Sequence, residues 1–191
     1  MKDSVGEFQD ARGDSDVKIT ETVSYLAMTS PQQLVTGKSP SRAAELRIQH
    51  PPSPELNESF YRAVGGDWTW VDRLSWGTEE WYAYVLRPDV ETWTLWVEET
   101  MAGYVEFNVH ADSGVEIAQL GLLPEFIGQG LGGYMLTLAV EEAWKKTPSR
   151  VWLHTSSFDH PHALENYQAR GFRIFKKETY THYSIEQPPS A

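Results

Sequence analysis

The sequence predicts a mixed fold of the α/β or α+β class, in which helices pack against a sheet. Segments with alternating apolar residues, typical of strands, occur near both ends of the sequence and in its middle. Segments with helical apolar spacing lie between them, one directly after a cluster of glycines. The 191 residues, 40% of them hydrophobic, suffice for one sizeable core, so a single domain is expected.

The first expected elements lie before residue 53. Residues 1–16 are polar, acidic and without periodicity, which indicates a disordered or loosely ordered acidic tail. Alternation over Val17 to Met28 predicts a strand. Prolines interrupt the next stretch, where a short strand or an irregular segment is expected near Glu45 to Gln49.

Two helices are expected next. The first begins at Ser53, has a proline in its first turn and ends at the Gly-Gly pair at 65–66. The second takes Thr78 as its N-cap and ends before Pro88.

Most of the chain's eight tryptophans lie in or beside these helices, between Phe60 and Trp96. Two interpretations stay open: core and helix-packing mass, or an aromatic wall around a substrate cleft. The same segment contains carboxylates suited to a cationic substrate, namely Asp67, Asp72, Glu79 and Glu80.

The middle of the chain predicts a meander of strands. Residues 92–110 hold two apolar runs joined through Glu98 to Gly103, which indicates a hairpin. Residues 115–123 form a further strand, in which Gly121 suits a bulge or a close approach of another backbone.

The remaining elements alternate. After Leu131 the apolar spacing becomes that of a buried helix face, which Pro148 ends. A strand over 149–157, a helix before Gly171 and a closing strand or hairpin over 172–185 complete the expected order. The expected domain is therefore 17–187, with an N-terminal strand, irregular segment and helices at 17–90 and the main part of the sheet at 91–187.

Composition excludes several classes of function. The absence of cysteine excludes disulfides, thiolate metal sites and a cysteine nucleophile. A formal net charge of −11 argues against nucleic acid as a partner and suits a cationic substrate better. No apolar run is long enough to span a membrane, and the N-terminus lacks the build of a signal peptide. A soluble, cytoplasmic monomer or homodimer without membrane contact is expected.

Four glycines lie within residues 128–133, which match G-x-G-x-x-G. A dinucleotide-binding fold is disfavoured because Pro124 to Phe126 separate the glycines from the preceding strand, and too few residues follow for a doubly wound sheet. Tyr134 stands where a phosphate-binding P-loop requires lysine. A glycine turn that opens a helix nevertheless offers unpaired N–H groups and a helix dipole to an anion.

Two motifs resemble one known family. The stretch LLPEFIGQGLGGYML, residues 122–136, resembles the acetyl-CoA signature of GNAT-type N-acetyltransferases, and VWLHTSSFDHPHALENYQARGFRIFKKE, residues 151–178, resembles that family's next strand, helix and closing strand. The resemblance extends over 92–178. It implies a mixed, mostly antiparallel sheet flanked by helices, with a splayed strand pair at the cofactor site. It also implies direct acetyl transfer from acetyl-CoA, as co-substrate, to a primary amine of a small molecule or peptide, without a metal.

The resemblance also assigns the cofactor site. It implies that residues 91–187 bind acetyl-CoA and that the helices at 17–90 face the acceptor. Backbone groups at Leu122 and Leu123 would bind the pantetheine and the thioester oxygen, and His160 stands where an Asn of the second motif usually contacts the pantetheine. Ile127 replaces the signature's leading Arg or Gln, so only main-chain groups serve the phosphates at that point. The residues expected around the pyrophosphate are Gly128, Gln129, Gly130, Leu131, Gly132 and Gly133.

Three side chains are candidates for the proton transfers. Tyr167 stands where the family places the acid that protonates the coenzyme A thiolate. Glu116 lies six residues before Leu122, so alternation puts both on one face of the strand, and it is a candidate base acting directly or through water. His154 is the other candidate base. Two rival functions remain: a non-catalytic acyl-CoA-binding sensor or scaffold, and a different nucleotide-binding module.

Overall fold

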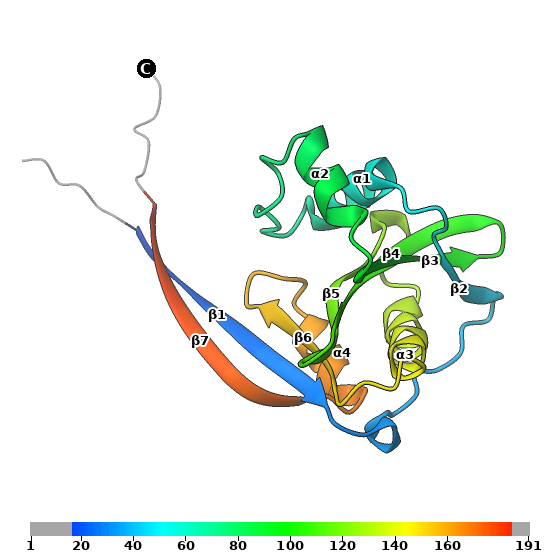
Figure 1. The fold of residues 1–191 in the computed structure, drawn as a ribbon. Coiled ribbons are helices and arrows are strands. Elements are labelled where there is room, and N and C mark those ends of the chain that lie inside the picture. Colours follow the sequence, from blue (N-terminus) through cyan, green and yellow to red (C-terminus); the bar gives the residue numbers. More distant parts are fainter. Residues whose placement is uncertain (1–16, 185–191) are drawn as a thin grey trace, which may run out of the picture.

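The computed structural model describes residues 17–184. The tail expected at 1–16 and the last three residues of the expected domain lie outside this range. The described chain forms one seven-stranded sheet in the order β2-β3-β4-β5-β6-β1-β7, in which all neighbours are antiparallel except β5 and β6 (Figure 1). The predicted mixed, mostly antiparallel sheet is therefore confirmed.

The elements follow the predicted order closely. The strands are β1 Val17–Met28, β2 Ala44–Ile48, β3 Val90–Val97, β4 Thr100–His110, β5 Gly114–Leu122, β6 Val151–Ser156 and β7 Arg173–Ser184. The helices are α1 Pro54–Gly65, α2 Thr78–Val85, α3 Leu131–Trp144 and α4 Ala163–Ala169, with short 3-10 turns η1 Pro31–Gln33 and η2 Pro124–Phe126.

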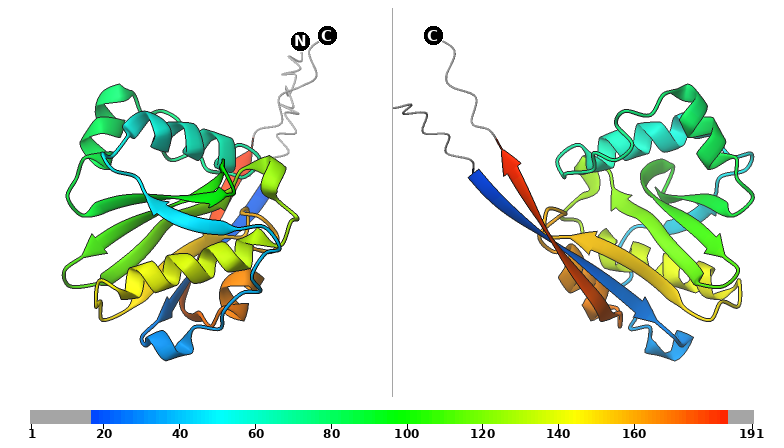
Figure 2. Two further views of the ribbon diagram at one scale, coloured as in Figure 1. Left: turned by 90° about the vertical axis from the view of Figure 1, so that its right-hand side faces the viewer. Right: turned by 60° about the vertical axis from the view of Figure 1, so that its left-hand side comes forward.

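The helices cover both faces of the sheet. Helices α1 and α2 lie on one face, and α3 and α4 lie on the other (Figure 2). The largest apolar cluster packs α3 against the sheet through fully buried residues such as Met135, Leu136 and Val140. Because the buried positions of α3 recur at helical spacing, the sequence indicates this face correctly.

One helix start differs from the prediction. In α2 the N-cap is Gly77, and Thr78 is the first helical residue. The reason is Glu80, whose carboxylate accepts the N–H of Gly77 at 2.9 Å and so satisfies a donor from within the first turn. In α1 the predicted start holds, because the hydroxyl of Ser53 accepts the N–H of Leu56 at 3.2 Å.

The bulge and the close approach that were alternatives at Gly121 occur at two different residues of β5. The bulge lies at Ala118, because Ile117 pairs with Phe107 and Gln119 with Glu106. Gly121 instead provides the close approach: a Cβ added there would lie 2.2 Å from Cγ1 of Val64 on α1. Helix α1 therefore packs directly on the backbone of β5.

Strands β5 and β6 pair only near one end. Their parallel register contains two residue pairs, Val115 with Val151 and Glu116 with Trp152, and the strands diverge beyond them. This is the predicted splayed pair. The divergence leaves one side of the later part of β5, up to Leu122, free of strand pairing.

The closing segment is one long strand rather than a hairpin. Strand β7 pairs with β1 along almost its whole length, and β1 also pairs with β6, so the first strand of the described chain separates β6 from β7. Strands β1 and β7 curve away together from the body of the domain (Figures 1 and 2).

Candidate active site

Two adjoining cavities lie around the splayed strands. The first has a volume of about 380 Å³ and lies between the glycine turn, α4 and the segment after α1. Its lining residues are Val64, Trp68, Trp70, Leu120, Gly121, Leu122, Ile127, Gly128, Gly130, Leu131, Gly132, Gly133, Met135, Asp159, His160, His162, Ala163, Asn166 and Tyr167.

The second cavity has a volume of about 470 Å³ and is bounded by β1, β6 and the segment after α1. Its lining residues are Glu21, Val23, Tyr61, Thr69, Trp70, Val71, Asp72, Ala118, Gln119, His154, Ser156, Phe158, Asp159, Tyr167 and His182. Three residues line both cavities: Trp70, Asp159 and Tyr167. The two cavities therefore adjoin at these three residues.

The glycine turn leaves an open cradle at the start of α3. Gly128 and Gly130 have φ angles of 80° and 75°, which glycine adopts without strain. A Cβ added at either position would meet no protein atom within 4 Å, so the missing side chains leave space for a ligand. Gly130 is the N-cap of α3 and has no side chain to satisfy the first helical N–H groups. These residues fit an anionic group such as a pyrophosphate.

Two arginines beside this turn were not found by the sequence analysis. The guanidinium of Arg42 donates to Oε1 of Gln129, whose Nε2 in turn donates to the carbonyl of Glu125 at 2.7 Å. A Cβ added at Gly133 would lie 2.6 Å from Nη1 of Arg170, so that guanidinium packs on the glycine. Both arginines come from segments distant in sequence, and no spacing rule relates them to the turn.

The two leucines before the turn differ in their backbone. Leu123 donates its N–H to the carbonyl of Ala102 at 2.9 Å, so the expected free amide at Leu123 is wrong. Because antiparallel pairing alternates, the N–H of the preceding residue points away from β4, toward the side where β6 diverges. Leu122 also lines the first cavity, and Leu123 does not.

Tyr167, on α4, lies where the two cavities meet. Within the described residues its hydroxyl makes no hydrogen bond, and its ring packs edge-on against Phe172 with 6.3 Å between centroids. Burial, together with the negative charge of Asp159, raises the pKa of Tyr167 above its ordinary value. The phenol is therefore protonated at neutral pH. His160 also lines the first cavity and lies edge-on to Trp68, 4.9 Å between ring centroids.

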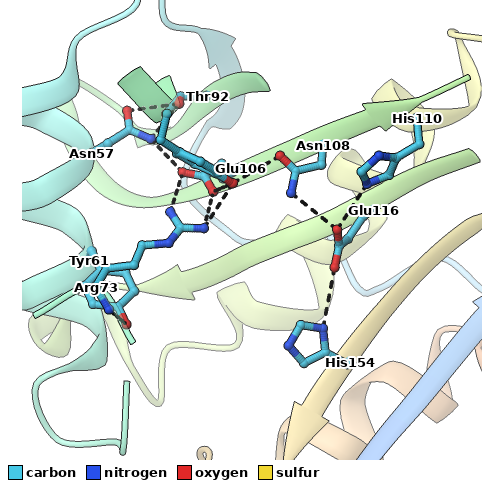
Figure 3. Close-up of polar contacts among 10 residues, drawn as sticks. Asn57, Tyr61, Arg73, Thr92, Glu106, Asn108, His110, Glu116 and His154 are labelled. Carbon is cyan, nitrogen blue, oxygen red and sulfur yellow. Dashed lines mark hydrogen bonds and ion pairs between the residues drawn. The ribbon is translucent and has the colours of Figure 1, made fainter. Parts of the chain in front are cut away.

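Glu116 and His154 form a pair beside the second cavity (Figure 3). Oε1 of Glu116 lies 3.5 Å from Nδ1 of His154, and Oε2 lies 3.3 Å from Nδ2 of Asn108 and 3.4 Å from Nε2 of His110. Burial alone would raise the pKa of Glu116, but these hydrogen bonds outweigh it and lower that pKa. The hydrogen bond from His154 to Glu116 raises the pKa of the imidazole.

His154 lines the second cavity, whereas Glu116 lines neither cavity. The bulge at Ala118 interrupts the alternation between Glu116 and Leu122, so the argument that both side chains share one face fails. The structure thus places the carboxylate behind the imidazole. A carboxylate in that position holds the ring nitrogen facing it in the protonated state.

A buried polar network around Glu106, on β4, adjoins this pair through Asn108 (Figure 3). Glu106 is fully buried and binds the guanidinium of Arg73 with both oxygens, at 2.9 and 3.2 Å. The hydroxyl of Tyr84 lies 2.7 Å from Oε1 of Glu106 and 3.0 Å from Oδ1 of Asn108. This chain of contacts fixes Asn108, which donates to Glu116.

The aromatic segment is divided between a core cluster and the walls of the two cavities. Trp81 is buried and packs with Tyr61 in a core cluster under α1 and α2. Trp68 lines the first cavity, and Trp70 packs against this cluster and lines both cavities. Of the four carboxylates expected to meet a cation, only Asp72 lines a cavity; Asp67, Glu79 and Glu80 line neither. Glu21, on β1, is an unexpected further carboxylate in the second cavity.

Comparisons with known proteins agree with this architecture. The sequence model of the acetyltransferase (GNAT) family matches residues 55–172. Comparison with curated protein sequences gives no match. Among helices of the described residues, none is long and apolar enough to cross a membrane.

Solved structures share the fold at low sequence identity. A GCN5-related N-acetyltransferase from Sphaerobacter thermophilus has a TM-score of 0.62 at 15% identity, with 93% of this chain and 62% of that chain covered. One from Kribbella flavida has a TM-score of 0.57 at 19% identity, with 87% and 59% covered. A Bacillus subtilis acetyltransferase in complex with CoA has a TM-score of 0.53 at 19% identity, with 69% and 77% covered. The chain thus spans about six tenths of the first two structures.

Proposed function

The chain belongs to the acetyltransferase (GNAT) family, and on that premise we propose that it transfers an acetyl group from acetyl-CoA directly to a primary amine. The observation that carries the proposal is the junction of the two cavities at Trp70, Asp159 and Tyr167. The first cavity contains the open turn at Gly128 and Gly130, and the second contains the carboxylates of Glu21 and Asp72. Direct transfer requires the two reacting groups to be held in contact, and a shared boundary between two binding cavities meets that requirement.

The first cavity is the proposed acetyl-CoA site. The open space at Gly128 and Gly130 and the free N–H groups of the first turn of α3 suit its pyrophosphate. Arg42 and Arg170 add positive charge beside the turn, which offsets the unfavourable net charge of the protein. The N–H of Leu122 is the proposed donor to the thioester oxygen.

When bound, acetyl-CoA supplies a thioester carbon that accepts the lone pair of an amine as the C–S bond breaks. Tyr167 holds its proton at neutral pH and donates a hydrogen bond toward the leaving sulfur. His154 is the proposed acceptor of the proton lost by the attacking nitrogen, and Glu116 orients it from behind. The assignment makes Glu116 a positioning residue rather than the base itself.

The second cavity is the proposed acceptor site, and its charge favours a cationic amine. Glu21 and Asp72 contribute carboxylates, and neither lysine nor arginine is among its lining residues. Trp70 and Tyr61 provide aromatic surface against which an alkyl chain or a sugar ring packs. Small-molecule or peptide amines both suit this description.

Amine-dependent release of coenzyme A is the direct test. The protein is incubated with acetyl-CoA and a panel containing a polyamine, an aminoglycoside, an amino acid and a short peptide. Released thiol and the acetylated product are then measured by a thiol reagent and mass spectrometry. We expect both with at least one amine. Tight coenzyme A binding without transfer to any amine would favour a sensor or scaffold. Binding of ATP or NADH that coenzyme A does not displace would favour a different nucleotide-binding module.

A further inference from the structure

Asp159 is the one carboxylate among the described residues that lines both cavities. It lies in the turn between β6 and α4, eight residues before Tyr167. A single aspartate in a turn is typical of many loops, so the sequence alone does not single it out. Its place at the junction, beside the other shared residues, gives it access to the point where acceptor and acetyl-CoA meet.

The carboxylate of Asp159 is held by three hydrogen bonds and can accept another. Its Oδ2 accepts hydrogen bonds from Oγ1 of Thr155 at 2.6 Å and from the backbone N–H of Ser156 at 2.8 Å. Its Oδ1 accepts one hydrogen bond, from Nε1 of Trp70 at 3.2 Å. A carboxylate oxygen accepts about two hydrogen bonds. Within the described contacts, one acceptor position on Oδ1 is therefore unused.

No lysine or arginine within the described residues forms an ion pair with Asp159. The donors that hold it are neutral groups, so its negative charge is fixed in place without being neutralised. The titratable groups that feel its charge are His154 and Tyr167, which line the second cavity with it. A fixed anion of this kind attracts a cation or a group that becomes cationic during a reaction.

We propose that Asp159 binds the reacting amine of the acceptor through the unused position on Oδ1 and stabilises the positive charge that develops on its nitrogen. The inference rests on the proposed acetyl transfer. In that reaction the C–N bond forms with the nitrogen lone pair, the C–S bond breaks, and its electron pair leaves with the sulfur. The nitrogen becomes positive until it loses a proton to His154, and the sulfur leaves as a thiolate that accepts a hydrogen bond from Tyr167 and takes its proton from solvent. Asp159 takes no part in the proton transfers.

The test replaces Asp159 by asparagine, which keeps the shape and removes the charge. We expect kcat/KM for the best amine of the panel to fall at least about tenfold, because a hydrogen bond to a charged group is lost. The affinity for coenzyme A, measured by calorimetry, should stay within about twofold, since the carboxylate contributes no attraction to an anionic ligand. Asp112→Asn, in the exposed turn between β4 and β5, is the matched control for the change in net charge.

A neutral inhibitor separates charge recognition from a structural role. In a primary alcohol analogue of the same acceptor, a hydroxyl replaces the amine, and its inhibition constant should not change in Asp159→Asn. A wild-type kcat/KM in this variant would overturn the inference, and so would parallel losses of coenzyme A and alcohol binding.

If the variant does not fold, Thr155→Val removes one donor to Oδ2 and should raise KM for the amine several-fold, whereas an unaltered KM contradicts the proposal. A wild-type protein inactive on every amine would overturn the proposed function as well.

Discussion

Tyr167→Phe removes one hydroxyl at the junction of the two cavities and retains the ring. Within the described residues that hydroxyl makes no hydrogen bond, and the ring keeps its edge-on contact with Phe172. The free energy of unfolding should therefore change by less than about 1 kcal/mol. The affinity for acetyl-CoA should also be retained, because the proposed role of the hydroxyl begins only when the C–S bond breaks.

The expected loss of rate follows from the chemistry of the leaving group. An ordinary thiol has a pKa of about 8.5, and burial raises the pKa of Tyr167 above its ordinary value of about 10. Full proton transfer from this phenol to a thiolate is therefore uphill, and the hydroxyl acts chiefly as a hydrogen-bond donor to the sulfur as it becomes negative. Such a bond to a charged group contributes about 1.5–3 kcal/mol, so kcat should fall about tenfold to a hundredfold.

The assay is thiol release at saturating acetyl-CoA and amine, with coenzyme A affinity measured separately. Tyr134→Phe is the matched control, because Tyr134 lines neither cavity and its hydroxyl makes only a 3.4 Å contact with the carbonyl of Ala44. A kcat of Tyr167→Phe within about twofold of wild type would refute the role. A loss of coenzyme A affinity as large as the loss of rate would show that the hydroxyl acts in binding instead.

Three other substitutions test separate parts of the account. Gly130→Asp should lower the affinity for acetyl-CoA at least about a hundredfold, and the uncharged Gly130→Asn, which tolerates the same backbone conformation, should lower it much less. Equal losses in both variants, measured by calorimetry, would mean that the added negative charge has no effect on cofactor binding. Glu116→Gln should move the acidic limb of the pH profile of kcat/KM to lower pH. His154 must be neutral to accept a proton, and its raised pKa depends on the Glu116 carboxylate, so an unmoved limb would place the base elsewhere. Arg73→Met should destabilise the fold by about 3–5 kcal/mol in urea unfolding, since Glu106 stays buried without its partner, and a loss below about 1 kcal/mol would contradict that reasoning.

Local signals in the sequence predict most of the fold. Helix α3 follows from apolar spacing after a glycine turn, and the β3–β4 hairpin follows from two apolar runs with a polar connection. The position of β1 does not follow from any local signal. Its partners, β6 and β7, lie more than a hundred residues away, and only the assembled sheet shows that it separates them.

The site is predicted less completely, for two physical reasons. Backbone sites such as Gly128 and Gly130 are visible in a sequence because glycine marks them. Side chains that converge from distant segments are not visible, and Arg42, Glu21 and Asp159 belong to that group.

The error at Glu116 has a different origin. Period-two alternation requires a regular strand, and the bulge at Ala118 interrupts it between Glu116 and Leu122. A bulge adds one residue without a clear signal in the side chains around it. The carboxylate of Glu116 contacts His154, the other candidate base, but the expectation that it shares a strand face with Leu122 is wrong.

A crystal structure of the protein with coenzyme A tests the central claim most directly. The account predicts the pyrophosphate against the main-chain N–H groups at 128–133, and the sulfur beside Asp159 and Tyr167. Coenzyme A bound away from the start of α3, with that turn free of phosphate, would contradict it.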